Sequence, residues 1–243
     1  MAGIIHIQKS AQTFFSKALD IILPPRCLCC NNDVLEQGAI CAGCYGNLKA
    51  IGTHKCHRCG LPFEFEHDPK AICASCAQNK PKFDMARAFC AYQGLGGDLA
   101  TKLKFGDKTS LAPYMAKLMC VAGSGLIKKA DVVTAVPLYR TRKLWRKYNQ
   151  AALLAQYVAK YSGIKYEPFL LKRIKNTKQQ TRLSKLERAE NVADAFNAQP
   201  VHDKRVLVID DVMTTGATMS ACAKALKKQG AKKVYGLVFA IVN

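Results

Sequence analysis

The sequence lacks any apolar run of the roughly 18 to 20 residues that a membrane-spanning helix requires. Its first residues also lack the succession of positive charges, apolar stretch and small-residue cleavage site that directs export. Disorder is excluded as the main state, because 49% of the 243 residues are hydrophobic and can bury a substantial core. From these absences we expect a folded protein of the cytoplasm.

Acidic residues are scarce, and the shortage is uneven. The chain has 37 Lys and Arg against 17 Asp and Glu, a net charge of +20. Residues 1–80 are nearly balanced, with 8 basic and 6 acidic side chains, whereas residues 81–243 hold 29 and 11. A surplus of this size favours a polyanionic ligand such as nucleic acid or clustered phosphates, and the second part of the chain supplies it.

Cysteine, in contrast, is concentrated in one stretch. Nine of the 12 cysteines fall between Cys27 and Cys76, and eight of these form four CxxC pairs. Two such pairs complete the four-sulfur shell of structural zinc, so the spacing predicts two zinc ions. The predicted ligands are Cys27, Cys30, Cys41, Cys44, Cys56, Cys59, Cys73 and Cys76.

Disulfides and iron–sulfur clusters are the rivals of zinc for these cysteines. Disulfides would need an oxidising compartment, and the spacing does not match the familiar iron–sulfur patterns. We expect Cys29, His54, His57 and His67 not to be ligands, and the spacing leaves open whether the pairs combine in order or interleave. A closed four-cysteine site favours a structural scaffold, with a docking surface for nucleic acid or protein as the alternative.

The pattern of residues predicts three parts. Residues 1–25 form an N-terminal helix that ends at two prolines, residues 26–80 form the zinc-binding domain, and residues 81–243 form an α/β domain. In the last part short apolar strands alternate with helices, which is typical of a parallel sheet with helices on both faces. Ligands of such folds bind at the carboxyl ends of the strands.

One segment satisfies that rule most clearly. The apolar run that begins at Val206 is followed by Asp210 and Asp211, and a helix begins beyond Gly216. The turn before the helix offers unpaired amides, hydroxyl groups and the positive end of a helix dipole, which together suit a phosphate. The carboxylates would then face vicinal hydroxyls, directly or around Mg²⁺, as in a ribose 5-phosphate. The predicted phosphoribosyl site comprises Asp210, Asp211, Met213, Thr214, Thr215, Gly216, Ala217 and Thr218.

The segment resembles the phosphoribosyl pyrophosphate motif of type I phosphoribosyltransferases, and the whole chain from Cys27 is similar to the ComF competence proteins. The features that carry this resemblance occur in the expected order: the cysteine pairs, Val136-Pro137-Leu138, Tyr148-Asn149-Gln150-Ala151, Gln180, Asn191-Val192, Ala195-Phe196 and the segment Asp210–Thr218. Two positions depart from it, Lys147 where relatives commonly have glycine and Tyr139 where they often have histidine.

The resemblance also implies roles for two further loops. The residues after Val136 would form the pyrophosphate loop, and residues 176–195 the hood that closes over the substrate. Residues 139–188 contain 14 basic residues and only two acidic ones, Glu167 and Glu187. The candidate contacts to pyrophosphate or DNA are Arg140, Arg142, Lys143, Trp145, Arg146, Lys147, Arg182 and Arg188.

Trp145 is the only tryptophan, and cations flank it on both sides. Single-stranded nucleic acid uses this combination, because bases stack on the ring while phosphates meet the cations. The alternative is that Trp145 anchors its own loop against the domain.

Two functions follow from the resemblance. The first is a cytoplasmic factor of natural transformation that binds single-stranded DNA and a phosphoribosyl pyrophosphate-type ligand, with DNA-uptake helicase or processing proteins as partners. The alternative is an active phosphoribosyltransferase. In it Asp210 and Asp211 would fix the ribose while Mg²⁺ and Arg140 or Arg142 assist the departure of pyrophosphate. No residues define a pocket for the acceptor.

Overall fold

The computed structural model describes residues 24–105, 108–139, 148–175 and 194–242. Residues 1–23, which hold almost all of the predicted N-terminal helix, lie outside the described residues. The chain divides into two compact units, Met1–Asn47 and Leu48–Asn243. The domain boundaries at residues 25 and 80 stay predictions.

The described part of the first unit, residues 24–47, is built around turns. Arg26 and Asp33 form an antiparallel bridge and an ion pair of 2.8 Å, which closes the first CxxC turn. The second turn leads into the short helix α2 (Ala42–Gly46), whose N-cap is Cys41. Few of these described residues are buried, so apolar burial among them gives little stability.

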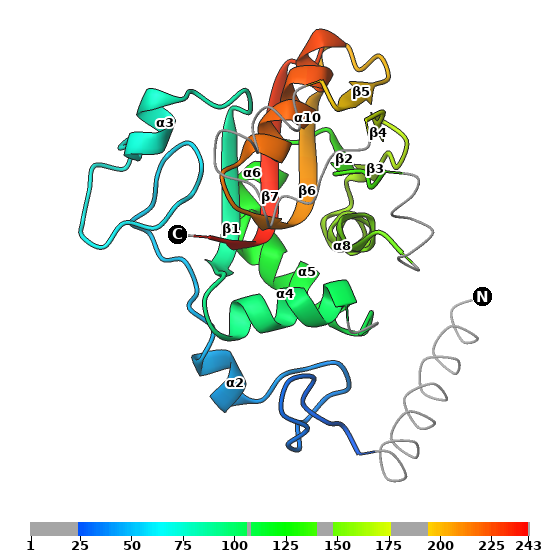
Figure 1. Ribbon diagram of the computed structural model, residues 1–243. Helices are drawn as coiled ribbons and strands as arrows, with labels where there is room; N and C mark the ends of the chain where they lie inside the picture. The colour runs from blue at the N-terminus through cyan, green and yellow to red at the C-terminus, as the bar shows by residue number, and fades with distance from the viewer. Residues whose placement is uncertain (1–23, 106–107, 140–147, 176–193, 243) are drawn as a thin grey trace, which may run out of the picture. The chain divides into compact units, whose positions relative to one another are not determined.

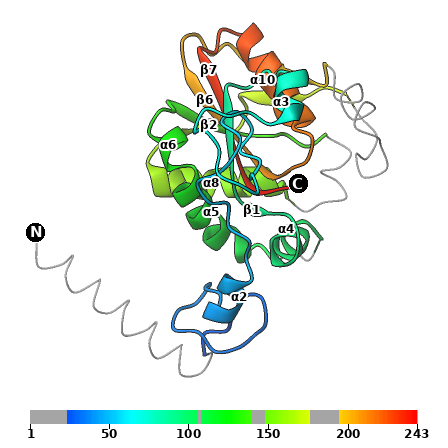
Figure 2. The same ribbon diagram turned by 90° about the vertical axis from the view of Figure 1, so that its left-hand side faces the viewer.

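The second unit contains a five-stranded parallel sheet among its described residues, with the order β1-β7-β6-β2-β3. Figures 1 and 2 show helices on both faces of this sheet. The elements of the unit are α3 (Ala74–Gln78), β1 (Met85–Ala91), α4 (Leu95–Phe105), α5 (Leu111–Ala122), α6 (Ser124–Ile127), β2 (Val132–Ala135), α8 (Gln150–Ser162), β3 (Lys165–Tyr166), β4 (Leu171–Arg173), β5 (Phe196–Ala198), β6 (Arg205–Met213), α10 (Ala217–Lys228) and β7 (Lys233–Ile241).

The inner strand β7 shows which helices cover which face. A Cβ atom at Gly236 would lie 3.1 Å from Met219 of α10, so this helix packs against the face that holds Gly236. Leu237, the next residue, lies against Gly123 at the end of α5. Because successive side chains of a strand point to opposite faces, α10 and α5 cover opposite faces of the sheet. The predicted α/β architecture is confirmed.

The edge strand β1 is covered by the residues around the second cysteine group. Ala50 bridges Cys90 in antiparallel fashion, and the amide of Ile51 donates to the carbonyl of Phe89 at 2.8 Å. Further along the strand, the amide of Ala86 donates to the carbonyl of Arg58 at 2.7 Å. An open edge strand offers unpaired backbone groups, and these bonds satisfy part of that edge.

Two short strands lie outside the main sheet. β4 and β5 pair antiparallel, from Leu171 with Ala198 to Arg173 with Phe196. The guanidinium carbon of Arg173 lies 5.3 Å from the centre of the Phe196 ring, within the range of a cation–π interaction. This hairpin joins the two ends of the predicted hood, whose residues 176–193 lie outside the described part of the chain.

Among the described residues, none of the helices combines the length and apolar character that crossing a membrane requires.

Candidate metal centres and anion-binding site

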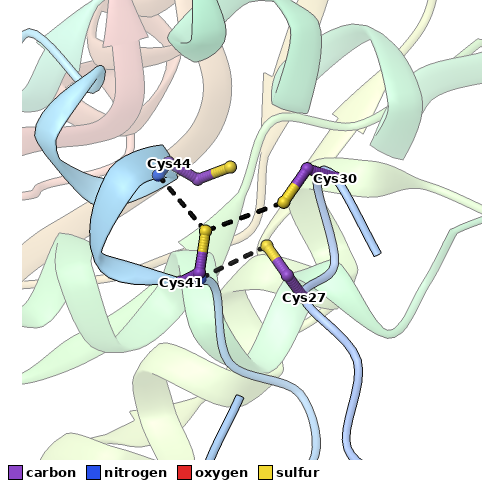
Figure 3. A group of neighbouring side chains, drawn as sticks. All are labelled: Cys27, Cys30, Cys41 and Cys44. Carbon is purple, nitrogen blue, oxygen red and sulfur yellow. Dashed lines mark hydrogen bonds between the residues drawn. The ribbon is translucent and has the colours of Figure 1, made fainter. Parts of the chain in front are cut away.

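Both four-cysteine groups assemble in chain order. In the first, the sulfur atoms of Cys27, Cys30, Cys41 and Cys44 all lie within 4.8 Å of one another, and Figure 3 shows the side chains gathered together. The second group joins Cys56, Cys59, Cys73 and Cys76 in the same way. The question that the spacing left open is settled, because the pairs do not interleave.

The sulfur separations fit a zinc ion. Zn–S bonds of about 2.3 Å in a regular tetrahedron place the sulfurs about 3.8 Å apart. The separation is 3.6 Å between Cys30 and Cys41, and also 3.6 Å between Cys59 and Cys73. The two clusters are therefore consistent with two structural zinc ions. Neither Cys29 nor a histidine belongs to the groups found in the described residues.

Backbone amides prepare the first group for a cation. Burial opposes ionisation of Cys27, but hydrogen bonds from the amides of Cys30, Cys41 and Cys29 outweigh it and lower the pKa of the Cys27 thiol to about 6. Burial and the neighbouring sulfurs raise the pKa of Cys44. Four sulfurs this close do not all ionise without a positive ion among them, and Zn²⁺ supplies that charge.

The second group has a further cation beside it. Arg87 of β1 donates to the carbonyl of His57 at 3.0 Å and to that of Ala86 at 2.7 Å. Burial lowers the pKa of Arg87, while the charges of Cys56 and Cys59 act to raise it. A four-thiolate zinc centre is negatively charged, so this guanidinium offsets part of its charge. Sequence reasoning missed this contact, because residue 87 lies beyond the last CxxC pair.

The second candidate site lies where β6 extends past its neighbour β2. Ala135, the last residue of β2, pairs with Ile209, and β6 continues for four residues to Met213. Asp210 pairs with Val238 of β7, so the two acidic residues belong to the strand itself. The sequence predicts them at the tip of a strand that ends at Ile209. The strand is longer because β7 remains beside it as far as Ile241.

The register of the strand places the two acidic residues alternately on its two sides. Asp210 pairs with Val238 and therefore shares the face of Gly236, which α10 covers. Asp211, the next residue, follows on the other side of the strand, and its carboxyl group still interacts with that of Asp210. Both residues are partly exposed, because β2 no longer covers this stretch of β6.

The charge of Asp210 is held in an unfavourable environment. Burial raises the pKa of Asp210 well above its ordinary value, and the Asp211 carboxylate adds to the rise. The amide of Asp211 donates to the Asp210 carboxylate at 3.0 Å, and the positive charge of Lys104 also lowers the pKa, but these effects are smaller. A perturbed carboxyl group at the carboxyl edge of a parallel sheet is typical of a functional site.

The turn after β6 leaves amides available to a ligand. Gly216 has φ +74°, a left-handed conformation that favours glycine, and it is the N-cap of the 12-residue helix α10. The amide of Ala217 donates to the Thr215 hydroxyl oxygen at 3.3 Å. Within the described residues the amides of Thr214, Thr215 and Gly216 have no acceptor. The arrangement can bind an anion such as phosphate.

The motif Tyr148-Asn149-Gln150 holds neighbouring elements at the same edge of the sheet. Asn149 is the N-cap of α8, and its amide nitrogen donates to the carbonyl of Val136, just beyond β2, at 3.1 Å. The Tyr148 hydroxyl donates to the carbonyl of Leu103, and Gln150 donates to that of Lys104 at 3.4 Å. In the sequence, only the resemblance to the ComF proteins draws attention to this motif. The structure gives it the physical role of joining α4, α8 and β2.

Several residues that the sequence predicts for the site have no position in the described part of the chain. The candidate pyrophosphate and DNA contacts lie outside the described residues: Arg140, Arg142, Lys143, Trp145, Arg146, Lys147, Arg182 and Arg188. The predicted phosphoribosyl residues, in contrast, all lie in the continuous stretch that forms the end of β6, the turn and the start of α10.

Two family models match separate parts of the chain. Residues 18–77 match a double zinc ribbon domain, and residues 149–240 match a phosphoribosyl transferase domain. Over 221 residues the chain is 28% identical to Competence protein F of Haemophilus influenzae, covering 86% of this chain and 93% of that protein. It is 29% identical over 224 residues to DNA utilization protein YhgH of Escherichia coli K12, with 88% and 96% covered.

Solved structures are more distant. A glutamine phosphoribosylpyrophosphate amidotransferase from B. subtilis has a TM-score of 0.37 and 23% identity, over 56% of this chain and 30% of that chain. A purine phosphoribosyltransferase from Pyrococcus horikoshii has a TM-score of 0.32 and 17% identity, over 53% and 86%.

Proposed function

We infer a role in DNA uptake or utilization for this chain, which joins a double zinc ribbon to a phosphoribosyltransferase domain and is homologous to Competence protein F and DNA utilization protein YhgH. These matches confirm the resemblance to the ComF proteins. Within that role we propose that the protein binds a phosphoribosyl pyrophosphate-type ligand and single-stranded DNA, and that it acts in the cytoplasm, where thiols stay reduced and available to zinc.

One observation carries the ligand proposal. The turn Thr214–Gly216 presents amides without an acceptor among the described residues, at the positive end of α10 and directly after two partly exposed carboxylates. Amides of this kind suit the 5-phosphate of a ribose, and carboxylates suit its hydroxyls. Because Asp210 pairs with Val238 on the side of α10, we propose that Asp210 meets the ribose while Asp211 faces the neighbouring loop.

Magnesium would enter with the ligand. Carboxylate oxygens and phosphate oxygens are the donors that Mg²⁺ prefers, and the end of β6 offers two carboxylates. The ion would neutralise part of the pyrophosphate charge.

The DNA proposal is supported by charge and by the names of the relatives. Residues 81–243 hold 29 basic and 11 acidic side chains, a surplus that attracts the backbone of a nucleic acid. One of the relatives is called a DNA utilization protein and another a competence protein. We propose that Trp145 and the cations around it form part of this surface.

The test of the ligand proposal is calorimetric titration of the zinc-loaded chain with phosphoribosyl pyrophosphate and Mg²⁺. We expect binding that Asp210→Asn combined with Asp211→Asn abolishes, with two zinc ions per chain retained in both proteins. If the double variant binds as the unchanged chain does, the proposed site is wrong. A parallel loss of zinc would show that the acidic pair is structural.

An active phosphoribosyltransferase is the second candidate, and the match of residues 149–240 to the transferase domain favours it. Pyrophosphate release would be measured with the chain, Mg²⁺, phosphoribosyl pyrophosphate and nucleobases or amines as acceptors. Release that Asp210→Asn abolishes would support the enzyme. Binding of the ligand without release from any acceptor would favour a binding protein.

A further inference from the structure

The outer surface of α5 and α8 carries aromatic rings and cations to which the phosphoribosyl site gives no role. The two helices pack against each other, and Figure 2 shows them as neighbours. On its inner side α8 buries Leu154, Ala155 and Val158 completely. Tyr157 and Tyr161 stay partly exposed, with 39% of Tyr161 accessible to solvent. Two tyrosines therefore remain on the surface after α8 has met the core.

Close contacts join these tyrosines to a lysine of α5. The rings of Tyr157 and Tyr161, four residues apart and so on one side of the helix, stack with their centres 6.1 Å apart. The Lys117 ammonium lies 6.0 Å from the centre of the Tyr161 ring, at the outer limit of a cation–π interaction. Burial raises the pKa of Tyr161, and Cys120 contributes to the rise, so the end of α5 lies beside the same ring. We call Lys117, Tyr157 and Tyr161 the tyrosine–lysine cluster.

The charge on the two helices is entirely positive. Neither α5 nor α8 contains an acidic residue. Lys160 lies three residues after Tyr157, on the same side of α8, and it is exposed like Lys117. Among the described residues neither lysine has an acidic partner. Between residues 108 and 175, the only acidic residues that the structure describes are Asp131 and Glu167, each paired with another cation at 2.6 Å. The surface therefore complements a polyanion.

The tyrosine–lysine cluster lies away from the anion-binding turn. Asn149, the N-cap of α8, is bonded to the carbonyl of Val136 at the carboxyl edge of the sheet. Tyr161 lies in the last turn of α8, about 18 Å further along the helix axis at 1.5 Å per residue. The chain then enters β3, where Lys165 pairs with Val132, the first residue of β2. This end of α8 is therefore at the amino edge of the sheet, and the cluster is separate from the phosphoribosyl site.

Rings and cations together suit single-stranded nucleic acid. Bases stack on aromatic rings whatever their identity, and the phosphates between them meet the cations. In a duplex the bases are already stacked on one another, and unstacking them costs free energy. An acidic protein would use the lysines but not the rings, and a second copy of this chain has the same net charge of +20. The chemistry therefore favours an unpaired strand.

We propose that the tyrosine–lysine cluster is a contact surface for single-stranded DNA, in which a base stacks on Tyr161 and extends the stack of the two rings. Lys117 has a long, flexible side chain, so it can leave the ring to the base and meet the adjoining phosphate, and Lys160 meets another. The inference rests on the proposed function, since it adds a second surface to the DNA binding proposed for Trp145.

The test measures binding of a fluorescent oligothymidylate of about 12 nucleotides to the full, zinc-loaded chain by anisotropy. Tyr161→Ala should weaken binding by roughly 5- to 100-fold, the loss of one stacked base, whereas Tyr161→Trp should retain it. A strand of the same length without bases should bind Tyr161→Ala and the unchanged chain equally. Lys117→Gln should reduce the slope of log affinity against log salt by about 0.7, the value for one phosphate contact.

Matched controls make the same changes away from the cluster. Phe169→Ala removes another exposed ring, 77% accessible, and Lys228→Gln removes a cation from the last turn of α10, which covers the opposite face of the sheet. Neither should alter the binding of oligothymidylate. Every variant should keep two zinc ions and bind phosphoribosyl pyrophosphate as the unchanged chain does.

A second measurement needs no substitution. An oligonucleotide that carries 5-iodouracil is crosslinked by light to the unchanged chain, and the linked peptides are identified by mass spectrometry. We expect crosslinks at Tyr157 or Tyr161. This result does not depend on whether a variant keeps its stability.

The outcomes separate this inference from the proposed function. If the unchanged chain binds oligothymidylate but Tyr161→Ala binds it equally well, or the crosslinks fall outside α8, the surface is overturned and DNA binding stands elsewhere on the chain. If the unchanged chain does not bind oligothymidylate, the proposed DNA binding fails and the surface fails with it. If Tyr161→Ala weakens binding of polyglutamate as strongly as that of oligothymidylate, the surface fits an acidic protein and the inference is overturned.

Discussion

Asp210 is a residue whose charge opposes folding. Burial and the Asp211 carboxylate raise its pKa in the folded chain above the value in the unfolded chain. A carboxyl group with a raised pKa holds its proton more tightly in the folded chain than in the unfolded chain. Its contribution to the free energy of unfolding is therefore greatest below the unfolded pKa of about 3.9. That contribution is lost as the pH rises through the folded pKa. A net cost of this kind is typical of a group kept for binding.

The first prediction concerns this carboxyl group. Asp210→Asn should increase the free energy of unfolding of the ligand-free protein at pH 8, and the gain should shrink as the pH is lowered toward 4. Urea unfolding at several pH values measures it. Asp211→Asn, which removes the neighbouring charge, should lower the pKa of Asp210 and give part of the same gain. A pH-independent difference between Asp210→Asn and the unchanged chain would contradict the prediction.

The second prediction concerns Gly216. Its φ of +74° is a strained backbone conformation for any residue with a Cβ atom. A Cβ atom added there would lie 3.5 Å from its nearest neighbour, which is an ordinary contact, so the cost of a substitution comes from the backbone conformation. Gly216→Ala should lower the free energy of unfolding by about 1 kcal/mol and abolish binding of phosphoribosyl pyrophosphate. Urea unfolding and calorimetric titration measure the two effects.

Gly163 offers the matched control for that change. It ends α8 with a φ of +73°, and a Cβ atom added there would have no neighbour within 4 Å. Gly163→Ala should have a similar effect on stability and none on the ligand. Equal effects of the two substitutions on binding would show that loss of stability, and not the geometry of the turn, explains the result.

At the scale of elements, the start of α8 joins two parts of the sheet edge through one side chain. The Asn149 side chain accepts from the amide of Ala151 at 3.1 Å as the N-cap, and donates to the carbonyl of Val136. The two bonds use different atoms of the same amide group. They can therefore be removed separately.

The third prediction follows from this division. Asn149→Asp keeps an acceptor for the cap but lacks the donor to Val136, whereas Asn149→Ala lacks both. Asn149→Ala should lower the free energy of unfolding by about 1 kcal/mol through the cap, and Asn149→Asp by less. Hydrogen exchange of the residues just after β2 should increase in both variants. Protection of that segment in Asn149→Asp equal to the unchanged chain would rule out the proposed link.

The cysteine clusters differ as elements, because the second lies in the same unit as the sheet and the first does not. The fourth prediction is that Cys73→Ser lowers the unfolding temperature of the unit that contains the sheet and exposes the amides of Ile51 and Ala86 to exchange. Cys41→Ser should remove one zinc and leave that temperature unchanged. Differential scanning calorimetry with zinc determination measures both, and equal effects of the two substitutions would overturn the prediction.

How far the sequence predicts these elements depends on the kind of element. The strands with long apolar runs and the amphipathic helices are predictable within a few residues, because burial dictates their patterns. The short hairpin of β4 and β5 is missed, since three-residue strands carry too little pattern. The extension of β6 through Asp210 and Asp211 is missed as well, because only the presence of β7 beside it holds two acidic residues in a strand.

The residues of the candidate sites are also predictable only where their own identity or spacing carries the signal. The spacing predicts all the residues of the two cysteine clusters, because two residues between cysteines are a geometric requirement of the zinc turn. Their order of assembly and the contact of Arg87 depend on tertiary structure and have no local signal. The turn Thr214–Gly216 is predictable because glycine, hydroxyl residues and acids carry their chemistry in their identity.

At the scale of the whole molecule, the basic surplus of residues 81–243 sets the salt dependence of DNA binding. The fifth prediction is that the logarithm of the affinity for oligothymidylate falls linearly with the logarithm of salt concentration, by about 0.7 for each phosphate contact. Fluorescence anisotropy at several salt concentrations measures the slope. An affinity that is insensitive to salt would mean that the surplus does not contact the DNA backbone.

The hydrogen bonds between β1 and the residues around the second ribbon have a practical consequence. A shortened protein that began near Lys80 would keep every strand of the sheet, yet it would leave the outer edge of β1 bare, with the amide of Ala86 and the carbonyl of Phe89 unsatisfied. Bare edges of this kind recruit strands from other molecules. Such a fragment would be prone to aggregate, and the ribbon therefore also protects the phosphoribosyltransferase-type sheet from self-association.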